Sequence, residues 1–179
     1  MTDGSGGPAP PEDEKRRHGL PPVAGSGARV LILGSFPSEQ SLERGEYYAN
    51  PRNQFWHVME ALFAIDRTLP YGERTAALVD RGVALWDVVA SCRRAGSSDA
   101  AIRDAEANDI AGFLDRHRRV RHIALNGTTG AEIQLRRHNP GIFSLPGITI
   151  ATYPSTSPAN ARYTLAEKVA AWEEICGFL

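Results

Sequence analysis

Four short hydrophobic runs recur along the chain, separated by longer segments of mixed character. A strand buried on both faces of a sheet requires apolar residues at successive positions, whereas a half-exposed strand shows alternation. The runs therefore predict four strands of a parallel sheet that is covered on both faces. They are residues 29–33 (RVLIL), 83–88 (VALWDV), 121–125 (RHIAL) and 148–152 (ITIAT).

Between and after these runs the apolar positions follow helical spacing. In the first such segment Phe55, Met59, Leu62 and Phe63 lie three or four positions apart and share one helix face. Strands that alternate with helices predict an α/β protein, a three-layer α/β/α fold with a central four-stranded parallel sheet. The predicted helices span residues 53–65, 71–81, 108–117, 128–137 and 165–178.

The first 27 residues are rich in Gly, Pro and charged residues and have no hydrophobic run. Such a segment buries too little apolar surface to offset its chain entropy, so we expect residues 1–27 to be a disordered tail and residues 28–179 to form one domain. No apolar run approaches the roughly 18 residues of a membrane span, and the start of the chain does not have the pattern of a secretion signal. We therefore expect no contact with a membrane.

Charge and cysteine content narrow the possible functions. The chain has 20 basic and 21 acidic residues, a net charge of −1, which excludes a globally basic nucleic-acid binder but leaves room for a local basic face. Cys92 and Cys176 are not part of a CxxC pair, so this chain alone cannot supply a four-thiolate zinc or iron–sulfur site. Two distant cysteines are typical of reduced thiols, and we expect a cytoplasmic protein.

Polar, Gly-rich and Pro-rich loops follow each predicted strand, at the sheet edge where parallel α/β folds bind ligands. The chain lacks GxxxxGK[ST], GxGxxG and GxSxG, so the usual phosphate loop, dinucleotide loop and nucleophile elbow are absent. The loops instead offer amides, hydroxyls and aromatic rings. This inventory suits a flat heterocycle, such as a base taken out of a DNA duplex into a pocket.

Five motifs in order, covering residues 29–179, resemble the uracil-DNA glycosylase superfamily, and in particular its hypoxanthine-DNA (deoxyinosine) glycosylase branch. The resemblance implies a four-stranded parallel sheet between helices, which agrees with the hydrophobic pattern. It also implies base-excision repair of damaged DNA by hydrolysis of the deoxyinosine N-glycosidic bond, without a metal or organic cofactor. We expect a monomer. The motifs are GSFPS (34–38), YYANPRNQFW (47–56), LWDVVASCRRAGSSD (85–99), ALNG (124–127) and PSTSPANA (154–161).

The resemblance places the catalytic amide in the second motif. In the mismatch-specific uracil branch the first loop reads GINPG and its Asn orients the attacking water, but Phe36 stands at that position here. The resemblance to the hypoxanthine branch implies that Asn53 takes over this role. Asn50 is the competing amide, and Asn53 also stands where a helix N-cap is expected. Tyr48 matches the aromatic residue that stacks on the extruded base.

The remaining candidates lie in the other loops. Asp87 either contacts the base edge or holds a loop, and Asn126 either contacts the base or is an ordinary turn residue before Gly127. The predicted substrate-binding residues are Ser35, Phe36, Tyr48, Asp87, Asn126 and Ser155. The predicted DNA-binding residues are Arg93, Ser157, Pro158, Asn160 and Arg162.

Beside the main expectation, two alternatives remain open from the sequence. No lysine lies in the five motifs to form a Schiff base, so a monofunctional glycosylase without strand cleavage is expected. A uracil or mixed-specificity glycosylase fits the same motifs. A non-catalytic nucleic-acid-binding module on the same fold also remains possible, because Phe36 replaces the usual water-orienting Asn.

Overall fold

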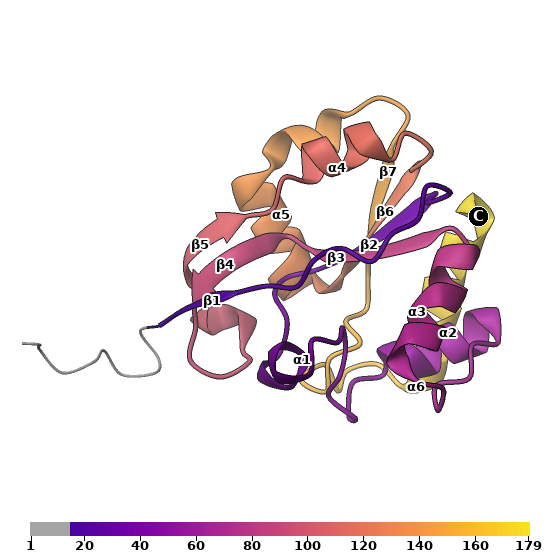
Figure 1. Ribbon diagram of the computed structural model, residues 1–179, viewed down its shortest axis with the longest axis horizontal. Helices are drawn as coiled ribbons and strands as arrows, with labels where there is room; N and C mark the ends of the chain where they lie inside the picture. The colour runs from indigo at the N-terminus through magenta and orange to yellow at the C-terminus, as the bar shows by residue number, and fades with distance from the viewer. Residues whose placement is uncertain (1–14) are drawn as a thin grey trace, which may run out of the picture.

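The computed structural model describes residues 15–179 and has a four-stranded parallel sheet at its centre (Figure 1). All three strand pairs are parallel, and the order across the sheet is β3-β2-β6-β7. The sequence prediction of four parallel strands is confirmed, with bounds that differ by one residue; β2, β3 and β6 are buried as predicted, whereas β7 is exposed or half-buried before Tyr153. The strands are β2 (Val30–Gly34), β3 (Val83–Asp87), β6 (His122–Asn126) and β7 (Thr149–Tyr153).

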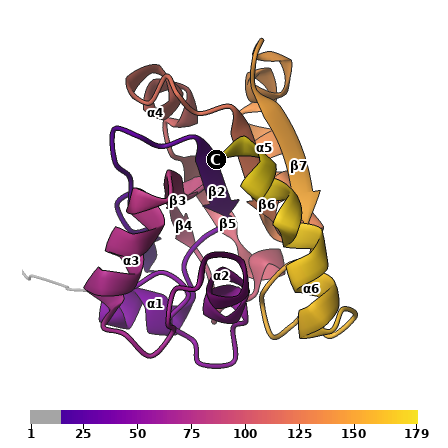
Figure 2. The same cartoon turned by 90° about the vertical axis from the view of Figure 1, so that its right-hand side faces the viewer.

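Helices cover both faces of this sheet, which confirms the predicted three-layer arrangement (Figures 1 and 2). Aromatic contacts join the layers: Trp86 packs on Phe113 with ring centroids 5.5 Å apart, and Tyr153 packs on Trp172 at 5.0 Å. No helix within residues 15–179 is long and apolar enough to cross a membrane. One face carries α2 (Phe55–Phe63), α3 (Tyr71–Asp80) and α6 (Leu165–Trp172), and the other carries α4 (Ile110–Arg116) and α5 (Ile133–His138).

The helix ends follow local chemistry. Gly82, with φ of +82°, follows α3 and ends it as predicted, because glycine adopts this conformation without steric cost. Asp109 accepts a hydrogen bond from the Gly112 amide and caps α4. The predicted helix 128–137 begins as a π-helical turn, Gly127–Glu132, before α5. The predicted helix 165–178 divides into α6 and a 3₁₀ segment, Glu173–Phe178.

A second, antiparallel sheet was not predicted. Its order is β1-β4-β5, and β4 follows β3 after a single residue, Val88, so part of the polar loop expected after the second strand is itself a strand. The side chains of Arg16, Ser91 and Glu106 link the three strands by hydrogen bonds of 2.8 and 2.9 Å. Because the outer strands read RRH and RDAEA, they show no apolar pattern. The strands are β1 (Arg16–His18), β4 (Val89–Arg93) and β5 (Arg103–Ala107).

The segment before the first buried strand also differs from the expected disorder over residues 15–27. β1 pairs with β4, and Val23 forms a bridge with Leu85, with hydrogen bonds of 2.9 and 2.8 Å in the two directions. Because β3 is an edge strand of the parallel sheet, the chain around Val23 covers backbone groups that would otherwise be open. The rest of the expected tail, residues 1–14, lies outside the described residues.

A short helix after the first strand was also not predicted. α1 (Glu39–Arg44) begins at Ser38, whose hydroxyl accepts a hydrogen bond from the Ser41 amide. It ends at Gly45, with φ of +66°. Its six residues are too few for a helical periodicity to stand out in the sequence.

Candidate functional site

The carboxyl edge of the parallel sheet brings four of the predicted substrate-binding residues together. Gly34 pairs with Asp87, and Asn126 pairs with Tyr153, so adjacent strands end at the same level. Ser35, Asp87, Asn126 and Ser155 therefore lie at, or one or two residues beyond, the strand ends. This convergence is a product of the parallel topology, because the segments are far apart in sequence.

Tyr48 lies at the centre of this edge in a conformation that is uncommon for a side chain of its size. Its φ is +57°. Such a backbone conformation costs roughly 1–3 kcal/mol and persists only where the surrounding contacts hold it in place. The ring stacks on Phe55 with centroids 3.8 Å apart and planes 14° apart. Its hydroxyl accepts a hydrogen bond of 3.2 Å from Asn126 Nδ2. Burial raises the pKa of Tyr48, so the hydroxyl is neutral at physiological pH.

Asn126 clamps the end of β6 to the loop after β7. Its Oδ1 accepts a hydrogen bond from the Thr156 amide at 2.9 Å, and its Nδ2 donates to Thr156 Oγ1 at 2.9 Å. Thr156 is fully buried. With Tyr48 also bound, both Nδ2 hydrogens of Asn126 are used within the protein. The side chain is therefore a cross-link in this structure rather than an ordinary turn residue.

The second motif orients Asn53 at the start of α2. The Asn53 amide donates to the Asn50 carbonyl at 2.8 Å, and the Asn53 Oδ1 accepts from the Phe55 amide at 2.9 Å. The N-cap position itself is occupied by Gln54, without a side-chain cap. Within residues 15–179, no hydrogen bond uses the Nδ2 of Asn53, whereas Asn50 Oδ1 closes its own turn onto the Arg52 amide.

Buried polar groups from distant helices anchor the loop after β7. The Gln54 amide donates to the Thr156 carbonyl at 2.9 Å, and Trp172 Nε1 donates to the Pro154 carbonyl at 3.0 Å. Lys168 Nζ donates to Gln54 Oε1 at 2.9 Å and to the Asn160 carbonyl at 3.0 Å. Lys168 is only 2% exposed, and burial lowers its pKa.

The rarity of lysine in this chain makes Lys168 stand out. Only Lys15 and Lys168 are lysines among the 20 basic residues of the chain. A lysine among the apolar positions of a helix is rarely buried unless its charge is paired, so its place there indicates a partner. Gln54 and Thr156 carried no such signal, because their partners lie in other parts of the chain.

Asp87 is a buried carboxyl group at the end of β3. It is 4% exposed, and its Oδ2 is buried without a hydrogen-bond partner among the described residues. Its other oxygen lies against the backbone of Gly34, where any side chain would collide with it. Burial, and secondarily the nearby Asp99, raise the pKa of Asp87 to about 8, although Arg94 opposes this shift. The carboxyl group is therefore mostly protonated at neutral pH.

Arg94, buried, and Asp99, half-buried, complete a charged cluster around the first motif; the sequence indicated Arg94 only as an arginine within reach of a phosphate and did not indicate Asp99. Ser35 Oγ donates a short hydrogen bond to Asp99 Oδ1. Arg94 is 1% exposed and donates to the Pro37 carbonyl. Burial raises the pKa of Asp99, while the Ser35 bond and Arg94 lower it.

Phe36 lies beside this cluster in the small core under the antiparallel sheet. Its ring packs with Val89 and Cys92, and the Arg94 guanidinium lies 4.9 Å from the ring centroid. The ring is 6% exposed. The Phe36 ring is therefore a packed part of this small core in the structure.

Four of the predicted DNA-binding residues share the loop after β7. Ser155 Oγ accepts from the Ser157 amide at 3.2 Å, and Asn160 Nδ2 donates to the Ser155 carbonyl at 3.1 Å, so these polar groups shape the loop. Pro158 and Arg162 are exposed. Arg93 lies on another element, β4, with its Nε 3.4 Å from Asp104 Oδ2.

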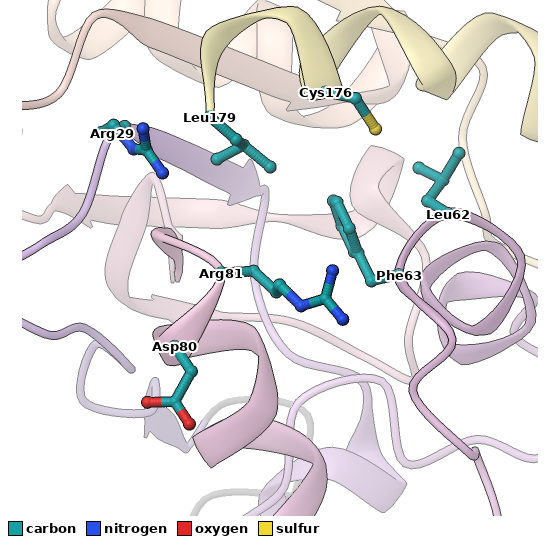
Figure 3. A pocket seen from close by; sticks show the side chains of 7 residues that line it. All are labelled: Arg29, Leu62, Phe63, Asp80, Arg81, Cys176 and Leu179. Atoms are coloured by element: carbon teal, nitrogen blue, oxygen red, sulfur yellow. The ribbon is translucent and has the colours of Figure 1, made fainter.

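An open cleft of about 330 Å³ lies at the opposite edge of the sheet (Figure 3). Arg29, which lines it, immediately precedes β2, so the cleft is at the amino ends of the strands. No residue of the predicted site lines it. The lining residues are Arg29, Leu62, Phe63, Asp80, Arg81, Cys176 and Leu179.

Comparison with known proteins decides the family. The sequence profile of the uracil DNA glycosylase superfamily matches residues 21–176. The chain belongs to this superfamily. It is 31% identical over 160 residues to the hypoxanthine DNA glycosylase of Methanosarcina acetivorans, covering 89% of this chain and 97% of that protein. It is 29% identical, with the same coverage, to the hypoxanthine DNA glycosylase of Methanosarcina barkeri.

A solved structure agrees with this membership of the uracil DNA glycosylase superfamily. The solution NMR structure of a candidate uracil DNA glycosylase from Methanosarcina acetivorans superimposes with a TM-score of 0.73 at 31% identity. The match covers 90% of this chain and 99% of that one. The family resemblance inferred from the five motifs and the three-layer fold are thus both confirmed.

Proposed function

We propose that this protein is a DNA glycosylase that hydrolyses the N-glycosidic bond of deoxyinosine and releases hypoxanthine. The observation that carries this proposal is the oriented amide of Asn53, whose Oδ1 is held by the Phe55 amide, together with the strained Tyr48 that stacks on the Phe55 ring. Superfamily membership and two relatives named hypoxanthine DNA glycosylase support it.

Asn53 is the proposed catalytic residue. Cleavage of a glycosidic bond passes through a positively charged, oxocarbenium-like sugar, so the enzyme has to place a water molecule at C1′. The Phe55 amide fixes Asn53 Oδ1, and the remaining lone pair of that oxygen can accept a hydrogen bond from the water. Preorganised polar groups of this kind are commonly worth about 3–4 kcal/mol each.

The extruded base is proposed to lie at the strand ends, near Tyr48 and Asp87, with the backbone amides of Ser35 and Phe36 at its edge. Phe55 covers one face of Tyr48, which leaves the opposite face or the edge of the ring for the base. The loop at 154–162, with Ser157, Pro158, Asn160 and Arg162, is proposed to contact the DNA backbone. Its anchoring by Asn126 and Lys168 gives this contact a rigid support.

We propose a monofunctional enzyme that leaves the DNA strand intact. Strand cleavage by a glycosylase needs a free amine to form a Schiff base with the abasic sugar. The Lys168 amine is buried and bonded to Gln54 and to the Asn160 carbonyl, so it is held within the protein.

The test is an excision panel with the purified protein. Duplexes that carry one deoxyinosine, deoxyuridine or deoxyxanthosine are incubated with enzyme, and abasic sites are detected by alkaline cleavage. We expect the fastest release from deoxyinosine and no strand cleavage before alkali treatment. Faster release of uracil would assign the enzyme to the uracil branch instead. DNA binding without abasic product on any lesion would indicate a non-catalytic module.

A further inference from the structure

Asp87 has a buried oxygen without a partner at the point where the base is proposed to lie. A buried polar atom without a hydrogen bond is costly, and folded proteins keep few of them. The unpartnered Oδ2 belongs to a side chain that is 4% exposed and lies against Gly34, beside the Tyr48 hydroxyl. An incoming base can supply the missing partner.

Burial, and secondarily the neighbouring Asp99, favour the acid form of Asp87, whereas Arg94 opposes it. Two acids and one guanidinium share this region. Asp99 is the acid with a hydrogen-bond donor, Ser35 Oγ, which favours its ionised form. The titratable groups that face Asp87 are Asp99 and Arg94 after β4, Tyr47 and Tyr48 before α2, and Tyr71 on α3.

We propose that Asp87 is the general acid of the reaction, donating its proton to a ring nitrogen of the departing purine, with Asp99 as the positioning residue that keeps it protonated. This inference rests on the proposed function. A carboxylic acid that an enclosed site keeps neutral can donate a hydrogen bond or a proton near neutral pH.

The proton and electron movements balance without a cofactor. The C1′–N9 bond breaks, and its electron pair moves onto the purine as the Asp87 proton is transferred to N7 or N3. Water, positioned by Asn53, forms a bond to C1′ and loses one proton. That proton restores the acid form of Asp87, so the products are neutral hypoxanthine and an abasic sugar.

The test compares wild type with Asp87→Asn on three substrates in single-turnover excision: deoxyinosine and its 7-deaza and 3-deaza analogues. In each analogue carbon replaces one ring nitrogen. On deoxyinosine we expect the variant to lose about 100-fold or more in rate, as for other general acids. On the analogue that lacks the protonated nitrogen, wild type and variant should react at the same slow rate.

The pH profile gives a readout that a structural role would not change. The wild-type rate on deoxyinosine should fall as pH rises through the pKa of Asp87, about 8, and this alkaline fall should be absent in Asp87→Asn. Asp99→Asn removes the negative charge that raises the pKa of Asp87, so the alkaline fall should move to lower pH. Asp80→Asn, an exposed acid at the other edge of the sheet, is the matched control and should keep the wild-type profile.

Several results would overturn the inference. Excision of hypoxanthine by Asp87→Asn at the wild-type rate contradicts it, as does a loss by the same factor on all three substrates. If Asp87→Asn does not fold, the wild type alone still tests the inference. A wild-type excision rate that falls at high pH on both analogues, as it does on deoxyinosine, contradicts the role of Asp87 as general acid. A wild-type protein that leaves deoxyinosine intact but releases uracil overturns the proposed function itself.

Discussion

Polar side chains have different surroundings at the two edges of the parallel sheet. At the carboxyl edge, Asn126 and Lys168 are buried or half-buried and cross-link segments that are distant in sequence, and Asp87 keeps an unmet hydrogen-bonding atom. At the amino edge, Arg29 and Arg81 line an open cleft of about 330 Å³ (Figure 3).

This contrast separates the open cleft from the residues that the motifs predict for the site. The largest apolar pocket is a common starting hypothesis for a binding site, but buried titratable groups with shifted pKa values are a second, independent one. Here the motifs lie with the shifted groups and not with the cleft. An enzyme that encloses an extruded base needs a tight site, which has little open space before the base enters.

The largest expected effect separates the two amides of the second motif. Asn53→Ala should lower the excision rate about 100- to 1,000-fold, as loss of one preorganised polar group does. Asn50→Ala, whose side chain closes only its own turn, should stay within a few-fold of wild type. Single-turnover rates on a deoxyinosine duplex measure both, and near-normal excision by Asn53→Ala would remove Asn53 from the mechanism.

The second effect concerns stability against pH. Because the folded state keeps the Asp87 proton up to about pH 8 while the unfolded chain loses it near pH 4, folding binds a proton between these values and stability falls as pH rises. Asp87→Asn removes this dependence. As pH increases over this range, the unfolding free energy of the variant should therefore rise relative to that of the wild type, by at most about 1.4 kcal/mol per pH unit. Urea titrations at pH 5, 6 and 7 measure it, and parallel curves would contradict the burial argument.

A smaller loss is expected from the buried lysine. Lys168→Met keeps the length of the side chain but leaves the Gln54 Oε1 and the Asn160 carbonyl without their donor. The unfolding free energy should fall by about 1–3 kcal/mol, the cost of leaving a buried acceptor unsatisfied. Excision should also slow, because Gln54 adjoins Asn53. Lys168→Arg keeps the positive charge that Lys168→Met removes. If Lys168→Met is as stable as wild type, the cross-link contributes little to stability.

The smallest effect belongs to the amino edge. Arg81→Met, in the open cleft, should change the unfolding free energy by no more than about 0.5 kcal/mol, as for most surface substitutions. Excision should match wild type. A large loss of excision in this variant would show that the cleft takes part in the reaction, and would erase the difference between the two edges.

The sequence was informative about the candidate site where both residues of a hydrogen-bonded pair lie in the same motif. The turn that joins Asn50, Asn53 and Phe55 is local, and the second motif by itself indicated Asn53 as the candidate amide. Asp99 lies inside the third motif, but its contact with Ser35 joins residues 64 positions apart. Nothing in the pattern of either segment indicates that pairing.

The sequence by itself determined the buried parallel sheet, its helical layers and the edge that carries the motifs. Continuous apolar runs admit few other structures, because each run has to be covered on both faces. Only the tertiary structure decided the antiparallel sheet, the clamp of Asn126 on Thr156, and the bond from Lys168 to Gln54, 114 positions away. These depend on backbone and side-chain hydrogen bonds between distant polar segments, which leave no periodic trace in the chain.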